Sequence, residues 1–322
     1  MLFDWAGQPF YTVVTTFIFA PYFTAQVAPD PATGQSWWGY ASAAAGLVIA
    51  LASPALGAIA DETGRRKAWL LAFSVLFFLG ACGLWRAEPG GQAPILLVLS
   101  AYVLATIGME FATVFNNAML PDIAPRRMIG RVSGAAWGLG YAGGLVALVL
   151  VLALLAGAPG GETTLIGLTP LGAGLGAAAG ERLTGPLSAL WYAVFVVPLF
   201  LFCPDVPARS KLGPAMRTGL ATLAATLRRL RDHRQVLRFL LARMLYQDGL
   251  NALILFGGIY ASGVFGWSTT EIGIFGILLA AFGAVGAWLG GRADDRFGAR
   301  TVVLVSVAAL ALLSVGLLSV TS

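Results

Sequence analysis

Long apolar runs, separated by short polar or charged segments, organise this chain from end to end. A bilayer core of about 30 Å needs about 20 apolar residues in a helix, and most of the runs are about this long. Regular alternation of apolar and polar positions is absent, which favours helices over strands. The runs predict nine membrane-spanning helices, at residues 6–28, 37–60, 68–86, 94–118, 131–157, 186–203, 237–262, 270–290 and 301–320.

Residues 158–185 are the ambiguous stretch between two predicted helices. They contain TLIGLTPLGAGLGAAAG, which is apolar but short, rich in glycine and interrupted by a proline. We expect an external loop here, with a re-entrant segment as the alternative, rather than a tenth span. A tenth span would also invert the charge pattern of every later loop.

Composition agrees with a membrane protein. Of the 322 residues, 58% are hydrophobic and 11% are charged, whereas soluble domains carry about 25% charged residues. So few charges cannot cover a water-facing surface, so we expect an all-α polytopic membrane protein. Cys82 and Cys203 lie in apolar runs without metal-ligand spacing, and His233 is alone in a basic loop. We therefore expect no metal site and no cofactor.

Basic residues gather in alternate loops. If the N-terminus is cytoplasmic, the inside loops hold Arg65, Arg66, Lys67, Arg126, Arg127, Arg131, the run from Arg209 to Arg238, Arg292, Arg296 and Arg300. The outside loops hold Arg86 and Arg182. Because cytoplasmic loops are enriched in basic residues, this asymmetry predicts a cytoplasmic N-terminus. It also explains the net charge of +5 without a nucleic-acid partner.

The central loop, residues 204–236, has a pattern of its own. Its leucines recur at helical spacing, and its arginines fill the opposite face; the leucines are Leu220, Leu223, Leu227 and Leu230, and the arginines Arg228, Arg229, Arg231 and Arg234. This pattern is typical of an amphipathic helix on the cytoplasmic leaflet, with a regulator-binding patch as the alternative. The loop divides the chain into an N-terminal six-helix half, 1–203, and a three-helix part, 237–322.

A charged motif occurs twice. GAIADETGRRK at 57–67 returns in degenerate form as GRADDRFGAR at 291–300, each copy between two predicted helices. The aligned positions are Gly57 with Gly291, Asp61 with Asp295, Gly64 with Gly298 and Arg66 with Arg300, all at one constant offset. The second helix therefore corresponds to the eighth, and the chain is an internal duplication of a six-helix unit.

Each residue type in this motif has a physical use. The first glycine lets a helix end approach a neighbour, and the aspartate can cap another helix N-terminus. The second glycine permits a tight reversal, and Arg65, Arg66 and Arg300 hold the loops inside. Such a cluster can act as a conformational latch between two helical units; the simpler interpretation is a charged turn.

The repeated pattern Gly-x-x-x-Asp-x-x-Gly-x-Arg resembles the signature loop of the major facilitator superfamily. DWAGQPFYTVVTTFIFAPYF (4–23) and FNNAMLPDIA (115–124) resemble, more narrowly, the autophagy-related vacuolar amino-acid effluxer family. The resemblance implies twelve helices, so we expect this chain to be truncated after about nine. It also implies that Asp295 meets the start of the fifth helix near Arg131, and that Asp61 lacks its partner, helix eleven. A bacterial plasma (inner) membrane is the implied location.

The resemblance places the substrate cavity on helices one, four, seven and ten, and polar stripes at helical spacing occur on the first three of these. The candidate cavity residues are Gln8, Tyr11, Thr15, Thr106, Glu110, Thr113, Asn117, Gln247, Asp248 and Asn251. Glu110 and Asp248 are the sharpest, because a mid-membrane charge costs about 2.5–3.5 kcal/mol and usually faces a cavity or partner. Either can carry a proton, bind a substrate ammonium group, or form an internal ion pair, for example with Arg243. We expect Asp4 at the membrane interface.

Glycines line two predicted helices. The fifth carries Gly130, Gly134, Gly138, Gly140 and Gly144, and the eighth carries Gly273, Gly276, Gly283, Gly286 and Gly290. The resemblance makes these helices face each other across the two halves, where small residues permit sliding during alternating access or simply close packing.

The hypothesis that follows is a secondary-active transporter of small polar solutes, with amino acids as candidate cargo and protons as a candidate coupling ion. An enzyme is not expected: ADDRFG at 293–298 has Gly298 where a metal motif needs an acid, HExxH is absent, and GxxxxGK[ST] is absent. The alternative is a non-transporting membrane scaffold or sensor, or an inactive transporter fragment.

Overall fold

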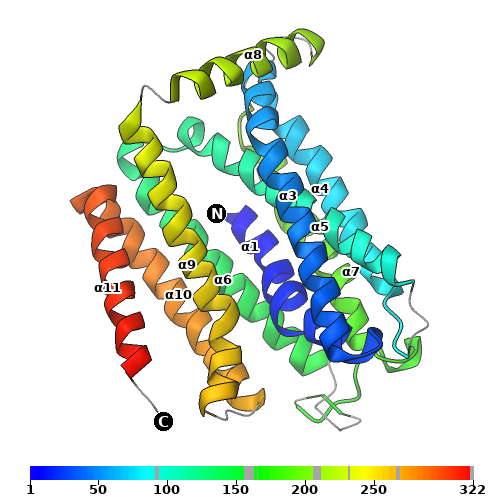
Figure 1. Cartoon of the computed structure of the whole chain (residues 1–322). Helices are drawn as coiled ribbons and strands as arrows, with labels where there is room; N and C mark the ends of the chain where they lie inside the picture. Colours follow the sequence, from blue (N-terminus) through cyan, green and yellow to red (C-terminus); the bar gives the residue numbers. More distant parts are fainter. Residues whose placement is uncertain are drawn as a thin grey trace.

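The computed structural model is an all-helical bundle. It describes residues 1–90, 94–155, 163–164, 166–205, 212–230, 233–265 and 269–319. Long helices run up and down side by side, and one helix lies across the end of the bundle (Figure 1). The predicted all-α class is confirmed.

Every predicted span falls on a helix. The first comprises four pieces, α1 (Leu2–Pro9), η1 (Phe10–Phe17), α2 (Phe19–Tyr22) and η2 (Phe23–Val27). The others in the first half are α3 (Pro31–Thr63), α4 (Arg66–Gly83), α5 (Ile95–Ile123), α6 (Ile129–Leu154) and α7 (Ala179–Phe202). They are followed by α8 (Leu212–Leu230), α9 (Arg234–Phe265), α10 (Thr269–Phe297) and α11 (Ala299–Ser319). Short turns are η3 (Leu84–Arg86), η4 (Arg126–Met128) and η5 (Ala173–Leu175). Among the described residues, six helical segments are long and apolar enough to cross a membrane.

Glycines bring α4 and α5 into backbone contact. A Cβ added at Gly80 would lie 2.5 Å from the Ala105 nitrogen, and one added at Gly108 would strike the Phe77 backbone. Contacts this close are possible only without side chains. They seat the first half around a core that includes Phe77 and Tyr192, whose rings meet edge to face.

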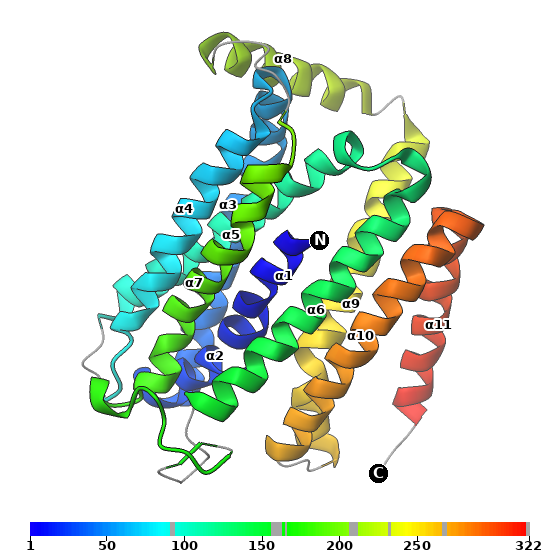
Figure 2. The ribbon, with the colours of Figure 1, turned by 180° about the vertical axis from the view of Figure 1, so that it is seen from behind.

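Helix α6 is the centre of the bundle, because glycines on two of its faces admit different neighbours. Gly140, Gly143 and Gly144 lie against α1 and η1, where added Cβ atoms would contact Asp4, Trp5 and Gln8. Gly130, Gly134 and Gly138 lie instead against α10. Figure 2 shows α6 between α1 and α10. The predicted meeting of the fifth and eighth helices is therefore present.

The glycines on α10 that were expected at this contact make it only in part. Gly283 contributes, since a Cβ added there would lie 3.4 Å from the Tyr141 ring of α6, whereas Gly286 and Gly290 do not. No described atom lies within 4 Å of a Cβ added at Gly286 or Gly290. A Cβ added at Gly291, in contrast, would lie 2.5 Å from the Gly130 carbonyl oxygen. The contact face of α10 runs through Ala284, Ala287 and Gly291, which lie against Gly138, Gly134 and Gly130 of α6. Alanine and glycine are small enough for the two backbones to approach there. The surroundings of Gly273 and Gly276 lie outside the described residues.

Helix α7 begins earlier than predicted. The expected external loop reached residue 185, but α7 begins at Ala179. The prediction assigns Arg182 to an outside loop because it is a basic residue beside a glycine-rich stretch. Arg182 instead lies inside the helix, where it is buried and donates to the Trp85 carbonyl oxygen and to Glu88. The rest of the expected loop contains η5, and its residues 158–162 and 165 lie outside the described residues.

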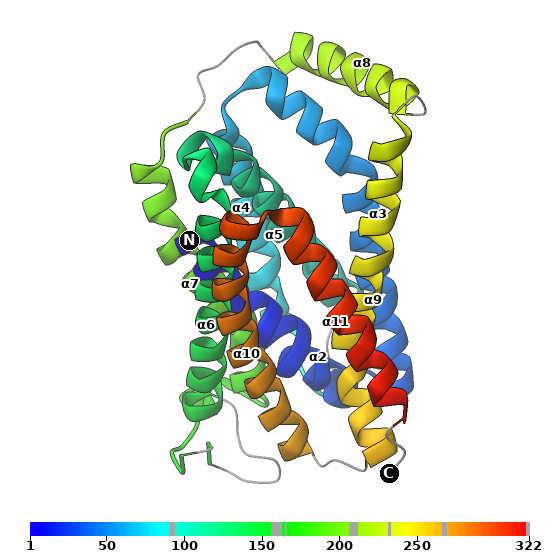
Figure 3. The ribbon, with the colours of Figure 1, turned by 90° about the vertical axis from the view of Figure 1, so that its left-hand side faces the viewer.

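The predicted amphipathic helix is present as α8, and it packs on α3. Figures 1 and 3 show α8 lying across the end of the bundle and leading into α9. Gly219 is buried against α3, and a Cβ there would lie 2.9 Å from the backbone carbonyl carbon and oxygen of Ala58. Leu220 and Leu223 remain exposed or half-exposed, and the Leu227 and Leu230 side chains lie outside the described residues.

Replacing Gly219 by Ala should loosen α8 from α3, since the added methyl group meets backbone that cannot turn aside. Gly213 on the same helix is the matched control, because a Cβ there meets no described atom within 4 Å. We expect faster amide hydrogen exchange along α8 in Gly219→Ala and no acceleration in Gly213→Ala, where alanine favours the helix. Equal exchange in both variants would contradict the docking.

Candidate functional site

Two polar side chains predicted from separate helices meet in the structure. The Tyr11 hydroxyl, on η1, donates to Glu110 Oε1, on α5, at 2.8 Å. Both side chains are partly buried. A carboxylate inside a helical membrane bundle is costly unless it has a partner or a cavity, and the phenol supplies that partner.

The backbone that carries Tyr11 is unusual. Residues Phe10–Phe17 form a π-helix, in which each backbone N–H bonds to the carbonyl five residues earlier. The Thr15 and Thr16 hydroxyls both donate to the Tyr11 carbonyl oxygen, at 2.5 and 2.9 Å. Such segments are rare and often occur at functional sites. Here the segment fixes the helix at the residue that holds Glu110.

Other predicted residues surround this pair. Thr113 donates to the Met109 carbonyl oxygen, and the Thr106 hydroxyl is buried one turn from Glu110. Gln8 lies one turn before Tyr11 and packs against Gly144 of α6. The stripes on the first and fourth spans therefore share one region.

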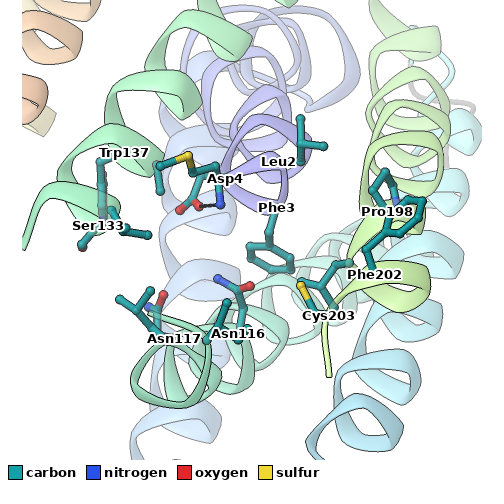
Figure 4. Close-up of a pocket in the computed structure, with 16 residues that line it drawn as sticks. Leu2, Phe3, Asp4, Asn116, Asn117, Ser133, Trp137, Pro198, Phe202 and Cys203 are labelled. Atoms are coloured by element: carbon teal, nitrogen blue, oxygen red, sulfur yellow. Dashed lines mark ion pairs between the residues drawn. The ribbon is translucent and has the colours of Figure 1, made fainter. Parts of the chain in front are cut away.

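A cavity of about 330 Å³ lies on the α8 side of the pair, between α1, α5, α6 and α7. Figure 4 shows Asp4, Asn116, Asn117 and Ser133 on one side of it, and Phe3, Pro198 and Phe202 toward the other. Asn117 was predicted here. Asp4 was expected at the membrane interface but lines this cavity, because the N-terminus lies about halfway along the bundle (Figure 2).

The candidates on the seventh span lie apart from the pair. Helix α9 packs mainly on α8 and α10 among the described elements, and the Gln247 and Asp248 side chains on it are exposed. The Asn251 side chain lies outside the described residues. Arg243 is also exposed, and in the described part of the chain the recorded partner of Glu110 is Tyr11.

The first signature loop ties the ends of two other helices. Gly64 and Arg65 both have positive φ, 71° and 39°, which makes the predicted tight reversal. Arg66 donates to the Ala118 carbonyl oxygen near the end of α5 at 2.5 Å, and Lys67 Nζ to the Phe200 carbonyl oxygen near the end of α7 at 2.9 Å. Cations at helix C-termini are favourable.

Asp61 has a local partner in this structure. It pairs with Arg66 at 3.4 Å while its side chain stays 69% exposed, so the pair is weak. Gly57 does not make the predicted close approach, because no described atom lies within 4 Å of a Cβ placed there.

The second signature loop joins the two parts of the chain. The Asp295 Oδ2 accepts from the Arg131 backbone N–H at 3.0 Å and lies 3.7 Å from Arg131 Nε. The aspartate thus caps the start of α6 from α10, which is the contact that the resemblance implied. Gly291 makes its predicted close approach to α6, and Gly298, at φ 81°, makes the reversal. Arg300 is exposed.

Two polar cavity residues, Asn116 and Ser133, escaped the sequence reasoning, and a third, Asp4, was assigned to the membrane interface instead. Asn116 precedes a predicted residue but lies off its helical stripe, and Ser133 lies in a glycine-rich span that was interpreted through packing alone. Asp4 preceded the predicted start of the first helix. A search for polar residues across neighbouring helix ends would have found them.

Comparison with known proteins identifies transporters. Residues 24–129 and 125–320 match the family described as vacuole effluxer Atg22 like. An uncharacterized MFS-type transporter, YxiO of Bacillus subtilis (strain 168), is 26% identical over 310 residues, which cover 95% of this chain and 69% of that relative. The MFS proton:xylose symporter XylE bound to 6-bromo-6-deoxy-D-glucose has the same fold, with a TM-score of 0.59 at 16% identity, over 92% of this chain and 68% of that one.

Proposed function

The chain belongs to the vacuole effluxer Atg22-like family of major facilitator superfamily transporters, and from this premise we propose that it is a secondary-active transporter of a small polar solute. It works by alternating access, with amino acids as the cargo and protons as the coupling ion. The observation that carries this proposal is the Tyr11–Glu110 hydrogen bond between the first and fourth spans.

Glu110 is the proposed proton carrier. A carboxyl group exchanges a proton reversibly, and its charged form is costly away from water. The Tyr11 hydroxyl stabilises the charged form by donating to it. When solute binding or a conformational change moves the Tyr11 hydroxyl away from Glu110, the Glu110 carboxylate loses that donor and takes up a proton more readily. Proton movement and solute movement are thereby linked.

The signature loops act as the proposed latch. Asp295 holds the N-terminus of α6, so separating α10 from α6 breaks a charge-assisted hydrogen bond, about 1.5–3 kcal/mol. The proposed halves are 1–203 and 237–322, joined by 204–236. The loops and α8 lie on the side that we assign to the cytoplasm of a bacterial cell.

Proteoliposomes test this function directly. Purified protein should release or take up radiolabelled amino acids faster than protein-free liposomes, and an imposed pH gradient should change the net flux. Flux that ignores the gradient would remove the proton from the proposal. No flux of any solute in the panel, from folded protein of either orientation, would contradict amino-acid transport by this chain.

A further inference from the structure

The cavity beside Asp4 has the size of a small-molecule site. Its volume, about 330 Å³, lies at the lower end of the range for ligand pockets, about 300–1,000 Å³. Four helices line it, it is open on one side, and apolar side chains form most of its wall. Small-molecule sites commonly combine an apolar wall with a few convergent polar groups.

The cavity is distinct from the Tyr11–Glu110 pair. Asp4 precedes Tyr11 by about two helical turns on the first span, and Asn117 follows Glu110 by about two turns on α5. At 1.5 Å per residue, this separates the two layers by about 10 Å. The cavity therefore lies on the α8 side of the pair, along the same two helices.

The described lining of the cavity holds one carboxylate and no basic side chain. Among its described lining residues, Asp4 supplies the carboxylate, neither lysine nor arginine is present, and the Met1 amino group is the cation beside it. Asn116, Asn117 and Ser133 add hydrogen-bonding groups on the same side (Figure 4). A solute ammonium group can take the place of the Met1 amino group on the carboxylate, and the amides and hydroxyl can accept further N–H donors.

Asp4 already faces an ammonium group. The Met1 amino group lies 3.8 Å from Asp4 Oδ2, and the Asp4 side chain is 18% exposed. A hydrogen bond from nitrogen to oxygen is about 2.7–3.2 Å long, so this pair is loose. The carboxylate can accept a closer donor from a solute, and Phe3 and Phe202 offer that solute an apolar surface.

We propose that this cavity is a second solute-binding site that takes a small molecule with a protonated amine and an apolar body. Asp4 is the counter-ion, and Asn116, Asn117 and Ser133 orient the amine. This inference rests on the proposed transport function only in identifying that molecule with the transported solute. The bound molecule then lies about two helical turns from Glu110.

Cys203 gives the site a native reporter. Its thiol lines the cavity, whereas Cys82 lies on α4, outside it. In the Cys82→Ala protein, the labelling rate of Cys203 by N-ethylmaleimide should fall when a ligand fills the cavity. Three probes of similar size test which charge the cavity prefers: n-butylammonium is a cation, n-butanol is neutral and butyrate is an anion at near-neutral pH.

We expect n-butylammonium to slow labelling, with little effect of the alcohol or the anion. In Asp4→Asn, half-protection should need at least about tenfold more n-butylammonium, because a charged hydrogen-bond partner is lost. Asp30→Asn is the matched control: Asp30 caps the exposed start of α3, where asparagine also caps. Asn117→Asp should lower the half-protecting concentration, which keeps the test valid if Asp4→Asn folds poorly.

Each contrary result overturns the inference. Equal protection by n-butylammonium and n-butanol would show an apolar cleft without an amine site. Protection by none of the probes would show that the cavity binds no such molecule, and unchanged protection in Asp4→Asn would remove the counter-ion. The Glu110→Gln variant should keep the protection of Cys203, because Glu110 does not line the cavity. If n-butylammonium protects Cys203 in the unmutated protein but that protein transports no solute, the result contradicts the transport proposal and leaves the amine site standing.

Discussion

Replacing Glu110 by Gln is expected to reduce pH-driven solute flux to the level of protein-free liposomes without unfolding the protein. The glutamine Oε1 can still accept from the Tyr11 hydroxyl, which donates to Glu110 at 2.8 Å, so the contact between the first and fourth spans survives. A glutamine side chain cannot bind or release a proton at the pH values of a flux assay. Two measurements are compared: net solute flux driven by an imposed pH gradient, and exchange of labelled for unlabelled solute without a gradient.

The two flux measurements separate the roles of Glu110. If Glu110 carries the proton, exchange persists in Glu110→Gln while gradient-driven flux disappears. If it binds the solute ammonium, both are lost. Gradient-driven flux equal to the original protein's would exclude Glu110 from the coupling path.

Tyr11→Phe is the companion variant. It removes the hydroxyl that bonds to Glu110 and keeps the ring, so we expect a partial loss of driven flux. Tyr40→Phe is its control, because Tyr40 is 73% exposed on α3 and should leave flux unchanged.

Replacing Gly134 by Ala is expected to destabilise the protein by about 1–3 kcal/mol, the usual cost of overpacking. The added Cβ would lie 2.5 Å from the Ala287 carbonyl oxygen and 2.7 Å from the Gly291 Cα, and both are backbone atoms. Helices α6 and α10 must then separate, which also lengthens the contact from Asp295 to Arg131. Thermal unfolding in detergent should show a midpoint lower by several degrees.

Gly286→Ala is the control with the opposite expected sign. No described atom lies within 4 Å of a Cβ at this position, so alanine adds helix propensity, about 0.5–1 kcal/mol, without a clash. A Gly134→Ala protein as stable as Gly286→Ala would mean that α6 and α10 do not pack at this distance.

Sequence periodicity was enough to place the spans, because each helix must cross about 30 Å of hydrocarbon and its length leaves little freedom. It failed where a local rule was overridden by packing. Arg182 was expected in an outside loop because it is charged, yet it lies inside α7, where it is buried and bonds to Trp85 and Glu88. Likewise, Gly286 and Gly290 matched a packing motif, whereas the face that contacts α6 is set by the direction in which α10 crosses it.

The candidate site was predictable to the same extent. Tyr11 and Glu110 are polar residues in apolar runs, and such residues are visible without a structure. Their contact depends on how the first span is wound, which a fixed 3.6-residue period does not describe. The cavity beside Asp4 is made from four helix ends, so no single stripe reveals it.

The π-helical winding of Phe10–Phe17 has a consequence for anyone who aligns or edits this sequence. Such a segment accommodates one residue more than an α-helix of the same rise, so it is equivalent to an insertion in a regular helix. Removing one residue there would restore a regular α-helix and leave the residues on either side facing their present neighbours. Asp4 and Gln8 would keep their places beside α5 and α6. A relative with a one-residue gap at this place would therefore keep the same lining, and the difference would be confined to the winding of Phe10–Phe17.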